Sequence, residues 1–263
     1  MGIVLCVNNN KGGVLKTTTT SNLAGVLSYL KKKVLVVDAD NQSNVSISFG
    51  LNPDNFRTTI YDVLVGGVPV EDTIVKIDKY IDLVPSNLDL VSFEFDVIGN
   101  PNKYPKPFLL MKDALDHLRD QYDYILIDTP PSLSLMNGNV FSFADNVIIP
   151  FEPEAYAMRS LMAVTTTVND FKGINPNLEI MGVIFTKVVH NANLHEVISQ
   201  ETKKYAFENG YKTFETVIPR TVQYANSIGF DRKPVTISNR KSEKSQLYFS
   251  LWNEIENTLK VVK

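Results

Sequence analysis

Residues 3–18 read IVLCVNNNKGGVLKTT, and this stretch decides the fold. It joins an apolar run, Ile3–Val7, to a turn with two adjacent glycines, and then to Lys16 and Thr17 at the start of a segment with helical periodicity. A strand, a glycine-rich turn and a helix N-terminus direct several backbone N–H groups at one point, where a phosphate chain fits. In such a loop the lysine reaches the β- and γ-phosphates, and the threonine hydroxyl ligates Mg²⁺. The stretch therefore predicts a phosphate-binding loop between the first strand and the first helix.

The rest of the chain alternates apolar, β-branched runs with segments of helical period. Most of the runs are almost continuously hydrophobic, as expected for strands covered on both faces. We therefore predict an α/β fold: a doubly wound, mostly parallel twisted sheet with helices on both faces, formed by one domain over residues 1–263. The predicted strands are Ile3–Val7, Val34–Asp38, Ile81–Val84, Tyr124–Asp128, Asn146–Pro150, Ile180–Phe185 and Thr213–Ile218.

Two of the predicted strands end in an aspartate. Val34–Asp38 is followed by a second acid, Asp40, and Tyr124–Asp128 is followed by a turn with two prolines. The carboxyl ends of parallel strands open on the ligand crevice, so these carboxylates are expected to face the bound ligand. An apolar strand that ends in aspartate is the arrangement in which the carboxylate holds Mg²⁺ or its water. We expect Asp128 to take that role.

The composition limits the class of protein. The chain has 263 residues, 44% hydrophobic and 21% charged, which is typical of a globular protein with a sizeable core. Its one cysteine, Cys6, excludes an internal disulfide and a cysteine-built metal site. The three histidines show no metal-ligand spacing. Without a signal peptide or a run of about eighteen apolar residues, the expected location is the cytoplasm.

Charge is distributed unevenly along the chain. The net charge is −3, but residues 1–185 hold 14 Lys and Arg against 21 Asp and Glu, whereas residues 186–263 hold 12 against 8. Most of the basic excess lies in residues 220–244. Such a bias fits either a solvated surface or a surface that faces a polyanion. The candidate contacts for DNA are Lys203, Lys204, Arg220, Arg232, Arg240, Lys241 and Lys244.

These motifs, in this order, resemble the ParA and MinD group of P-loop ATPases, and most closely the ParA-type, Soj-like partition ATPases. The loop from Lys11 to Thr17 is similar to the deviant Walker A motif K-G-G-x-G-K-[ST], with Leu15 where the family has glycine. The segment after Val34–Asp38 is similar to the family's D-x-D-P-Q-G-N. Later segments, up to Lys233-Pro234, continue the resemblance over nearly the whole chain.

The resemblance implies a site for ATP and Mg²⁺ and assigns its residues. Lys11 is the signature lysine that reaches the phosphates of a dimer partner, Lys16 binds the terminal phosphates, and Asp40 is the catalytic carboxylate. Metal ligation is implied for Thr17, Asp40 and Asp128. The residues implied in nucleotide binding are Lys11, Gly12, Gly13, Val14, Leu15, Lys16, Thr17, Thr18, Thr186, Pro219 and Arg220.

The function implied is ATP-dependent DNA partition, and we expect ATP hydrolysis to be slow because Leu15 replaces the glycine of the loop. The loop motif begins close to Met1, so the chain resembles the short form without an N-terminal helix-turn-helix. An ATP-bound dimer would coat non-specific DNA on the nucleoid, and a centromere-binding, ParB-like partner would stimulate hydrolysis and release. Two alternatives stay open: an adaptor or DNA-binding protein that has lost ATP turnover, for which Leu15 is the argument, and a MinD-like membrane ATPase. The last segment, 246–263, mixes acids with bases over an apolar stripe and favours packing on the core.

Overall fold

The computed structural model describes residues 1–132, 134–189 and 193–261. Within this part of the chain, eight strands form one sheet in the order β3-β4-β2-β5-β1-β6-β7-β8. β3 pairs antiparallel with β4, and the other neighbours in the sheet pair in parallel. The strands are β1 (Ile3–Val7), β2 (Val34–Asp38), β3 (Val75–Lys76), β4 (Ile81–Val84), β5 (Tyr124–Asp128), β6 (Asn146–Phe151), β7 (Glu179–Phe185) and β8 (Lys212–Thr213).

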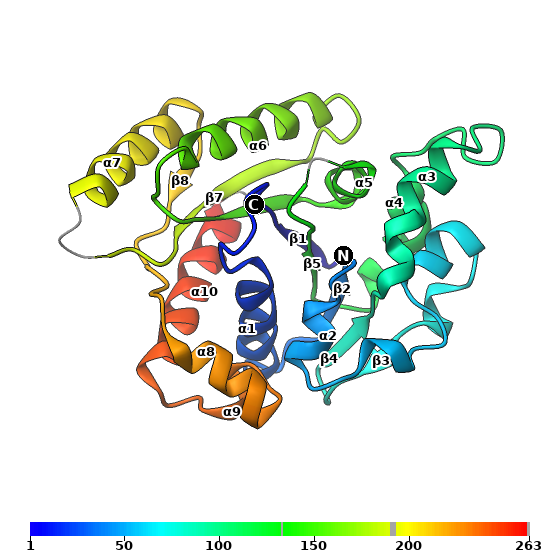
Figure 1. Cartoon of the computed structure of the whole chain (residues 1–263), viewed down its shortest axis with the longest axis horizontal. Helices are drawn as coiled ribbons and strands as arrows, with labels where there is room; N and C mark the ends of the chain where they lie inside the picture. Colours follow the sequence, from blue (N-terminus) through cyan, green and yellow to red (C-terminus); the bar gives the residue numbers. More distant parts are fainter. Residues whose placement is uncertain (133, 190–192, 262–263) are drawn as a thin grey trace.

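Helices cover both faces of the sheet (Figure 1). On one face lie α1 (Lys16–Tyr29), α2 (Asn44–Ser48), α8 (Val222–Asn226), α9 (Val235–Ser238) and α10 (Glu243–Val261). On the other face lie α3 (Phe93–Ile98), α4 (Leu110–Leu115), α5 (Leu135–Phe143), α6 (Ala157–Phe171) and α7 (Asn193–Glu208). Short 3₁₀ or π turns are η1 (Pro53–Asn55), η2 (Asp62–Gly66), η3 (Val70–Asp72), η4 (Leu88–Ser92), η5 (Asp116–Asp120) and η6 (Ser227–Asp231).

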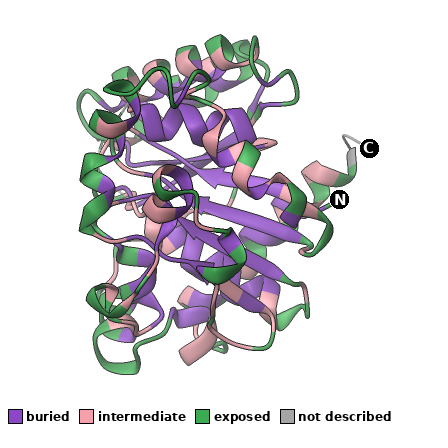
Figure 2. Cartoon of the chain, turned by 90° about the vertical axis from the view of Figure 1, so that its right-hand side faces the viewer, coloured by how far each residue is buried: buried purple, intermediate pink, exposed green. Residues whose placement is uncertain are grey.

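The predicted fold class is confirmed, and its physical basis is the burial of the strands. Every residue of β2 and β5 is buried, because helices cover both sides of these central strands. Figure 2 shows the strands buried in the middle and exposed positions on the outer helices and loops. Each face of the sheet has its own apolar core, so a continuous hydrophobic run is what a central strand needs.

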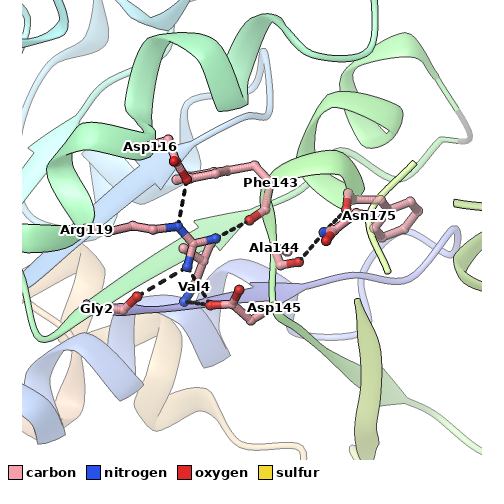
Figure 3. A network of polar contacts seen from close by, with 9 residues as sticks. Gly2, Val4, Asp116, Arg119, Phe143, Ala144, Asp145 and Asn175 are labelled. Carbon is pink, nitrogen blue, oxygen red and sulfur yellow. Dashed lines mark hydrogen bonds and ion pairs between the residues drawn. The ribbon is translucent and has the colours of Figure 1, made fainter. Parts of the chain in front are cut away.

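Arg119 ties together the amino ends of the strands (Figure 3). Its guanidinium donates hydrogen bonds to Asp116 Oδ1 at 2.9 Å, Asp145 Oδ2 at 2.7 Å and the Phe143 carbonyl at 2.7 Å. Asp145 Oδ2 also accepts the backbone N–H of Val4, in β1, at 2.8 Å. The network joins η5, the end of α5 and the starts of β1 and β6, so it holds the edge of the sheet that lies opposite the phosphate-binding loop.

The predicted strand Thr213–Ile218 is wrong in its extent. The structure has β8 only at Lys212–Thr213, and the chain then leaves the ladder. The carboxylate of Glu254, in α10, accepts the backbone N–H groups of Glu215 and Thr216 at 2.7 and 2.9 Å. These N–H groups are therefore satisfied by a side chain rather than by a neighbouring strand.

The C-terminal helix packs on the core. Tyr248, Leu251, Trp252 and Ile255 are buried in α10, and the Trp252 ring meets that of Tyr124 edge-on, with ring centroids 4.9 Å apart. The apolar stripe of this helix is therefore used inside the fold, as the sequence indicates. No helix in the described ranges is both long and apolar enough to cross a bilayer.

Candidate nucleotide-binding site

The candidate site lies at the carboxyl ends of three adjacent strands. β5 lies between β2 and β1, and Asp128 is in register with both Asp38 and Val7. The loop after β1 therefore starts beside the two aspartates that end β2 and β5. This is the edge at which parallel sheets bind ligands.

The loop between β1 and α1 turns by means of two left-handed residues. Gly13 has φ +77°, and Leu15 has φ 68° and ψ 31°. Lys16 Nζ folds back and donates a hydrogen bond to the Lys11 carbonyl at 3.1 Å. A left-handed leucine costs roughly 1–2 kcal/mol, because its Cβ crowds the following carbonyl. The loop thus keeps the turn that a glycine would allow, although the residue at this position is leucine.

Two threonines of α1 hold Asp128. Thr17 Oγ1 donates to Asp128 Oδ2 at 2.6 Å, and Thr20 Oγ1 donates to Oδ1 at 3.1 Å. Burial raises the pKa of Asp128 to about 7, and the two hydroxyl hydrogen bonds act in the opposite direction. A hydroxyl beside a buried carboxylate is a donor set that suits Mg²⁺, which takes one or two carboxylates and keeps its other positions for waters and phosphates.

Asp38 shapes the loop that carries Asp40. Both oxygens of Asp38 accept backbone N–H groups, from Asp40 and from Val45, each at 3.2 Å. Asp38 is fully buried, and this burial raises its pKa well above the ordinary value, as does the nearby Asp128. Asp40 reaches the cavity, where burial raises its pKa. Asp38 is therefore a positioning group, and Asp40 is the carboxylate that a ligand can meet.

Thr17 and Asp40 line one cavity of about 390 Å³, whereas Asp38 and Asp128 are fully buried and do not line it. Lys16 lines it, and burial lowers the pKa of this lysine while Asp128 and Asp40 act in the opposite direction. A single cation thus faces two carboxylates, which suits a phosphate chain accompanied by a divalent ion. The cavity is lined by Gly12, Gly13, Leu15, Lys16, Thr17, Thr18, Asp40, Gln42, Asn44, Ile47, Ser48, Pro131 and Ile228.

Two ion pairs next to the loop were not expected from the sequence. Lys11 Nζ lies 2.5 Å from Glu154 Oε2, and Lys187 Nζ lies 3.3 Å from Glu152 Oε2. Lys187 Nζ also lies beside Gly13: a side-chain Cβ at this position would be 3.9 Å from the ammonium nitrogen. Lys11 is thus held within its own chain by an acid of the loop that follows β6.

Five residues assigned to nucleotide binding do not line this cavity: Lys11, the fully buried Val14, Thr186, Pro219 and Arg220. Thr186 is buried just after the end of β7 and bridges to Ile218, and Pro219 and the exposed Arg220 directly follow Ile218 in the chain. The place of these last three is nevertheless at the same carboxyl edge of the sheet, beyond β6.

The predicted DNA contacts divide into separate groups. Lys203 and Lys204 lie on α7, where Lys204 Nζ is 3.9 Å from Glu208. Figure 1 shows α7 and α9 at opposite ends of the molecule's left side. Arg220 is exposed before α8, and Arg232 is exposed after η6. The basic residues 240–244 lie beyond α9, at the start of α10.

The structure adds a second basic segment to residues 240–244. The Arg240 guanidinium lies over the Tyr29 ring, with Cζ 4.5 Å from the centroid. Tyr29 ends α1 and is followed by Lys31 and Lys32, so two segments far apart in the chain meet there. We call the side chains of Tyr29, Lys31, Lys32, Arg240 and Lys241 the Arg240 surface. Lys244 lies next to it and pairs with Glu243 at 3.0 Å.

His117 and His195, the two histidines in the described part of the chain, take no part in the site. His117 Nε2 lies 2.6 Å from Glu71 at the surface, and His195 Nδ1 accepts the N–H of Val189. The third histidine, His190, lies outside the described residues. In the described part of the chain, no group of three or more His, Cys, Asp or Glu could hold a metal ion by itself. A magnesium ion at Asp128 would therefore need phosphate and water to complete its shell.

Comparisons with known proteins agree with this geometry. A family model described as an AAA domain matches residues 2–180. The chromosome partitioning protein ParA of Caulobacter vibrioides is 36% identical over 256 residues, which cover 96% of this chain and 93% of that protein. The chain belongs to the ParA family. Its relation to the family extends over nearly its whole length, as the resemblance in sequence implies.

Two solved structures share the fold and are named with nucleotides. A plasmid partition protein of Borrelia burgdorferi bound to AMPPNP has a TM-score of 0.80 and 28% identity, covering 98% of this chain and 99% of its own. A cobyrinic acid a,c-diamide synthase of Mycobacterium smegmatis with bound ADP and magnesium has a TM-score of 0.81 and 27% identity, covering 100% of this ParA-family chain and 97% of its own. Both a partition protein and a diamide synthase with this architecture thus bind a nucleotide.

Proposed function

We propose that this chain is an ATPase that drives the partition of a plasmid or chromosome, with residues 1–263 acting as one P-loop domain. One observation carries the proposal: Lys16, Thr17 and Asp40 line one cavity at the carboxyl ends of β1, β2 and β5, and Thr17 is hydrogen-bonded to the buried carboxylate of Asp128. The names of the 36% identical relative and of the Borrelia protein support partition as the purpose of this ATPase.

The residues divide the chemistry of ATP hydrolysis among them. The backbone of residues 12–18 receives the phosphates, and Lys16 meets the negative charge of the terminal ones. Thr17 and Asp128 would hold Mg²⁺, which neutralises charge on the β- and γ-phosphates when bound. Asp40 stands at the cavity wall, where it would orient the attacking water or accept its proton.

Lys11 gives the proposed link between ATP and dimerisation. Its ammonium group is held by Glu154 at the rim of the loop rather than by the cavity of its own chain. We propose that ATP binding releases Lys11, which then reaches the phosphates of a second copy. A charge-assisted bond to phosphate is among the stronger polar contacts and would replace the exposed ion pair.

The Arg240 surface is the proposed main contact with DNA. It joins two basic segments on one part of the fold, and the Tyr29 ring holds the Arg240 guanidinium in place. Lysine and arginine contacts to phosphates carry no sequence information, so binding would be non-specific and would weaken steeply with salt. Such binding would place the ATP-bound dimer on the nucleoid, and a centromere-binding, ParB-like protein would release it by stimulating hydrolysis.

An adaptor that binds DNA without turnover is the second candidate. The observation in its favour is the strained Leu15, which replaces the residue best suited to a left-handed turn. Against it, Lys16, Thr17 and Asp40 all line the cavity, and Asp128 is hydrogen-bonded to Thr17. A site freed from ATP would have no physical need for this set of charges.

Phosphate release and molecular mass, measured together, test the proposal. The protein is incubated with Mg-ATP with and without non-specific duplex DNA, and its mass is followed by light scattering. Slow phosphate release together with an ATP-dependent dimer supports partition chemistry. An ATP-bound protein that never releases phosphate supports the adaptor instead, and a protein that binds no ATP rules out the ATPase.

A further inference from the structure

One helical face beside the nucleotide cavity presents large apolar side chains to solvent. Leu88 and Val91 in η4 and Phe95 and Ile98 in α3 follow the spacing i, i+3, i+7, i+10, which places them on one side of a continuous helical segment. Their side chains are between 60% and 81% exposed. We call these four residues the η4–α3 face.

The fold does not need this face for its own core. The opposite side of the same segment already packs inward, where Leu90, Phe93 and Val97 are buried. A surface helix that packs one side on a core normally carries polar residues on the other. A contiguous apolar stripe in their place marks a site of interaction.

The charged residues of the segment that carries this face limit which kind of molecule can bind there. Residues 86–98 contain Asp89, Glu94 and Asp96 and no lysine or arginine. Within the described residues, none of these acids lies in an ion pair. The acids would repel DNA and an anionic bilayer, and a second copy using the same face would bring like charges together. A segment with apolar and basic side chains fits both the stripe and its rim.

Two hollows that border the segment give such an occupant places to insert side chains. A cavity of about 340 Å³ is lined by Val91, Glu94, Asn41 and Pro131, among others. A second, of about 280 Å³, is lined by Glu94, Ile98 and neighbouring residues of α5 and α6. Pro131 also lines the nucleotide cavity, so a molecule in the first hollow would touch the wall of that site.

We propose that the η4–α3 face docks a basic, amphipathic segment of another protein. Apolar side chains of that segment cover the stripe and fill the two hollows, and its lysines or arginines meet Asp89 and Glu94. Docking depends on these residues alone and not on the proposed ATPase activity. The two proposals can therefore fail separately.

Three synthetic peptides test the chemistry of the occupant. The first is an amphipathic helix of leucine, alanine and lysine, the second has the same composition in a scrambled order, and the third has glutamate in place of lysine. Fluorescence anisotropy with the full chain, without nucleotide and at near-physiological salt, measures binding. The first peptide should bind about tenfold or more tighter than the other two. Equal affinity for all three would overturn the proposal.

Variants of the chain locate the site. The double substitution Val91→Ser with Phe95→Ser should weaken the first peptide about tenfold or more, and Glu94→Gln should reduce the salt dependence of its binding. The matched control is Phe207→Ser, because Phe207 is 85% exposed on α7, far from the face. Circular dichroism confirms that each variant is folded.

Three further results would show either that the peptide binds elsewhere or that the face binds another kind of partner. Unchanged affinity in the double variant would place peptide binding elsewhere. Self-association of the parent that is lost in the double variant would make the face a contact between copies of this chain. Binding to phosphatidylglycerol vesicles that needs Phe95 would make it a membrane contact. Each of these results contradicts the proposal.

Discussion

Lys11 and Glu154 form an ion pair across the rim of the nucleotide loop, with Nζ and Oε2 2.5 Å apart. The two residues are 143 positions apart in the chain, and both side chains are partly exposed. If Lys11 has to reach the phosphates of a second copy, this pair must break first. In that case the pair would oppose dimerisation by the small free energy of an exposed ion pair.

Removing the acid should favour the dimer. Glu154→Gln keeps the shape of the side chain and removes its charge, so ATP-dependent dimerisation should tighten by about 1.4- to fivefold for each pair that no longer has to break, the range that ~0.2–1 kcal/mol allows. Sedimentation at graded protein concentrations in Mg-ATP measures the change, and Glu201→Gln on α7 is the control. A weaker dimer in Glu154→Gln would show that the acid assists assembly.

Asp40→Ala should separate binding from turnover. The variant loses the candidate base on the cavity wall, while Thr17 and Asp128 keep their contact. ATP affinity should stay within about threefold, and phosphate release should slow by about 100-fold or more. Single-turnover hydrolysis provides the measurement. Equal rates in variant and parent would remove Asp40 from the mechanism.

At position 15, glycine should give a more stable protein than alanine, which is the reverse of the usual order inside a helix. At φ 68° the backbone penalises any Cβ, so Leu15→Gly should be more stable to unfolding than Leu15→Ala by about 1 kcal/mol. Lys203, inside α7, should show the ordinary order, with alanine better by ~0.5–1 kcal/mol. Urea denaturation of the four variants gives the comparison. If alanine were more stable than glycine at both positions, Leu15 would not be left-handed.

A second effect is expected on nucleotide affinity. In calorimetric titrations, Leu15→Gly should bind Mg-ATP more tightly than the parent.

DNA binding should depend on both segments of the Arg240 surface. In Arg240→Ala with Lys241→Ala, the slope of log K against log salt should flatten by about 0.9 for each DNA phosphate that the protein no longer neutralises. The same flattening is expected in Lys31→Ala with Lys32→Ala. The comparison pair is Lys203→Ala with Lys204→Ala on α7, for which a smaller change is expected. If only the α7 pair flattens the slope, DNA lies on the other end of the molecule.

Local sequence was enough to predict the strands, turn and helix that form the candidate site. The stretch from Ile3 to Thr17 carries its own strand, turn and helix start, and Asp128 ends an apolar run whose burial any parallel sheet requires. The short β3, with two residues, offers no period to recognise. The length of β8 was overestimated because β-branched residues continue beyond its end, where the Glu254 carboxylate accepts the backbone N–H groups in place of a neighbouring strand.

Contacts between distant segments could not be predicted. The pairing of Lys11 with Glu154, the stacking of Arg240 on Tyr29 and the position of Lys187 beside Gly13 all depend on how the layers pack. Charge alone selected residues 220–244 but not Lys31 and Lys32, because these two follow α1 at the other end of the sequence. The spacing of the η4–α3 face is visible in the sequence, but its exposure is not.

Calorimetric titration of the protein with Mg-ATP tests the central claim most directly. The parent should bind one ATP per chain, and Lys16→Ala should bind about 10- to 100-fold more weakly, because it loses a charge-assisted interaction worth ~1.5–3 kcal/mol. Lys76→Ala, at an exposed position on the edge strand β3, should match the parent. Equal affinity in the parent and Lys16→Ala, or no binding by the parent at millimolar ATP, would contradict the assignment of this cavity to ATP.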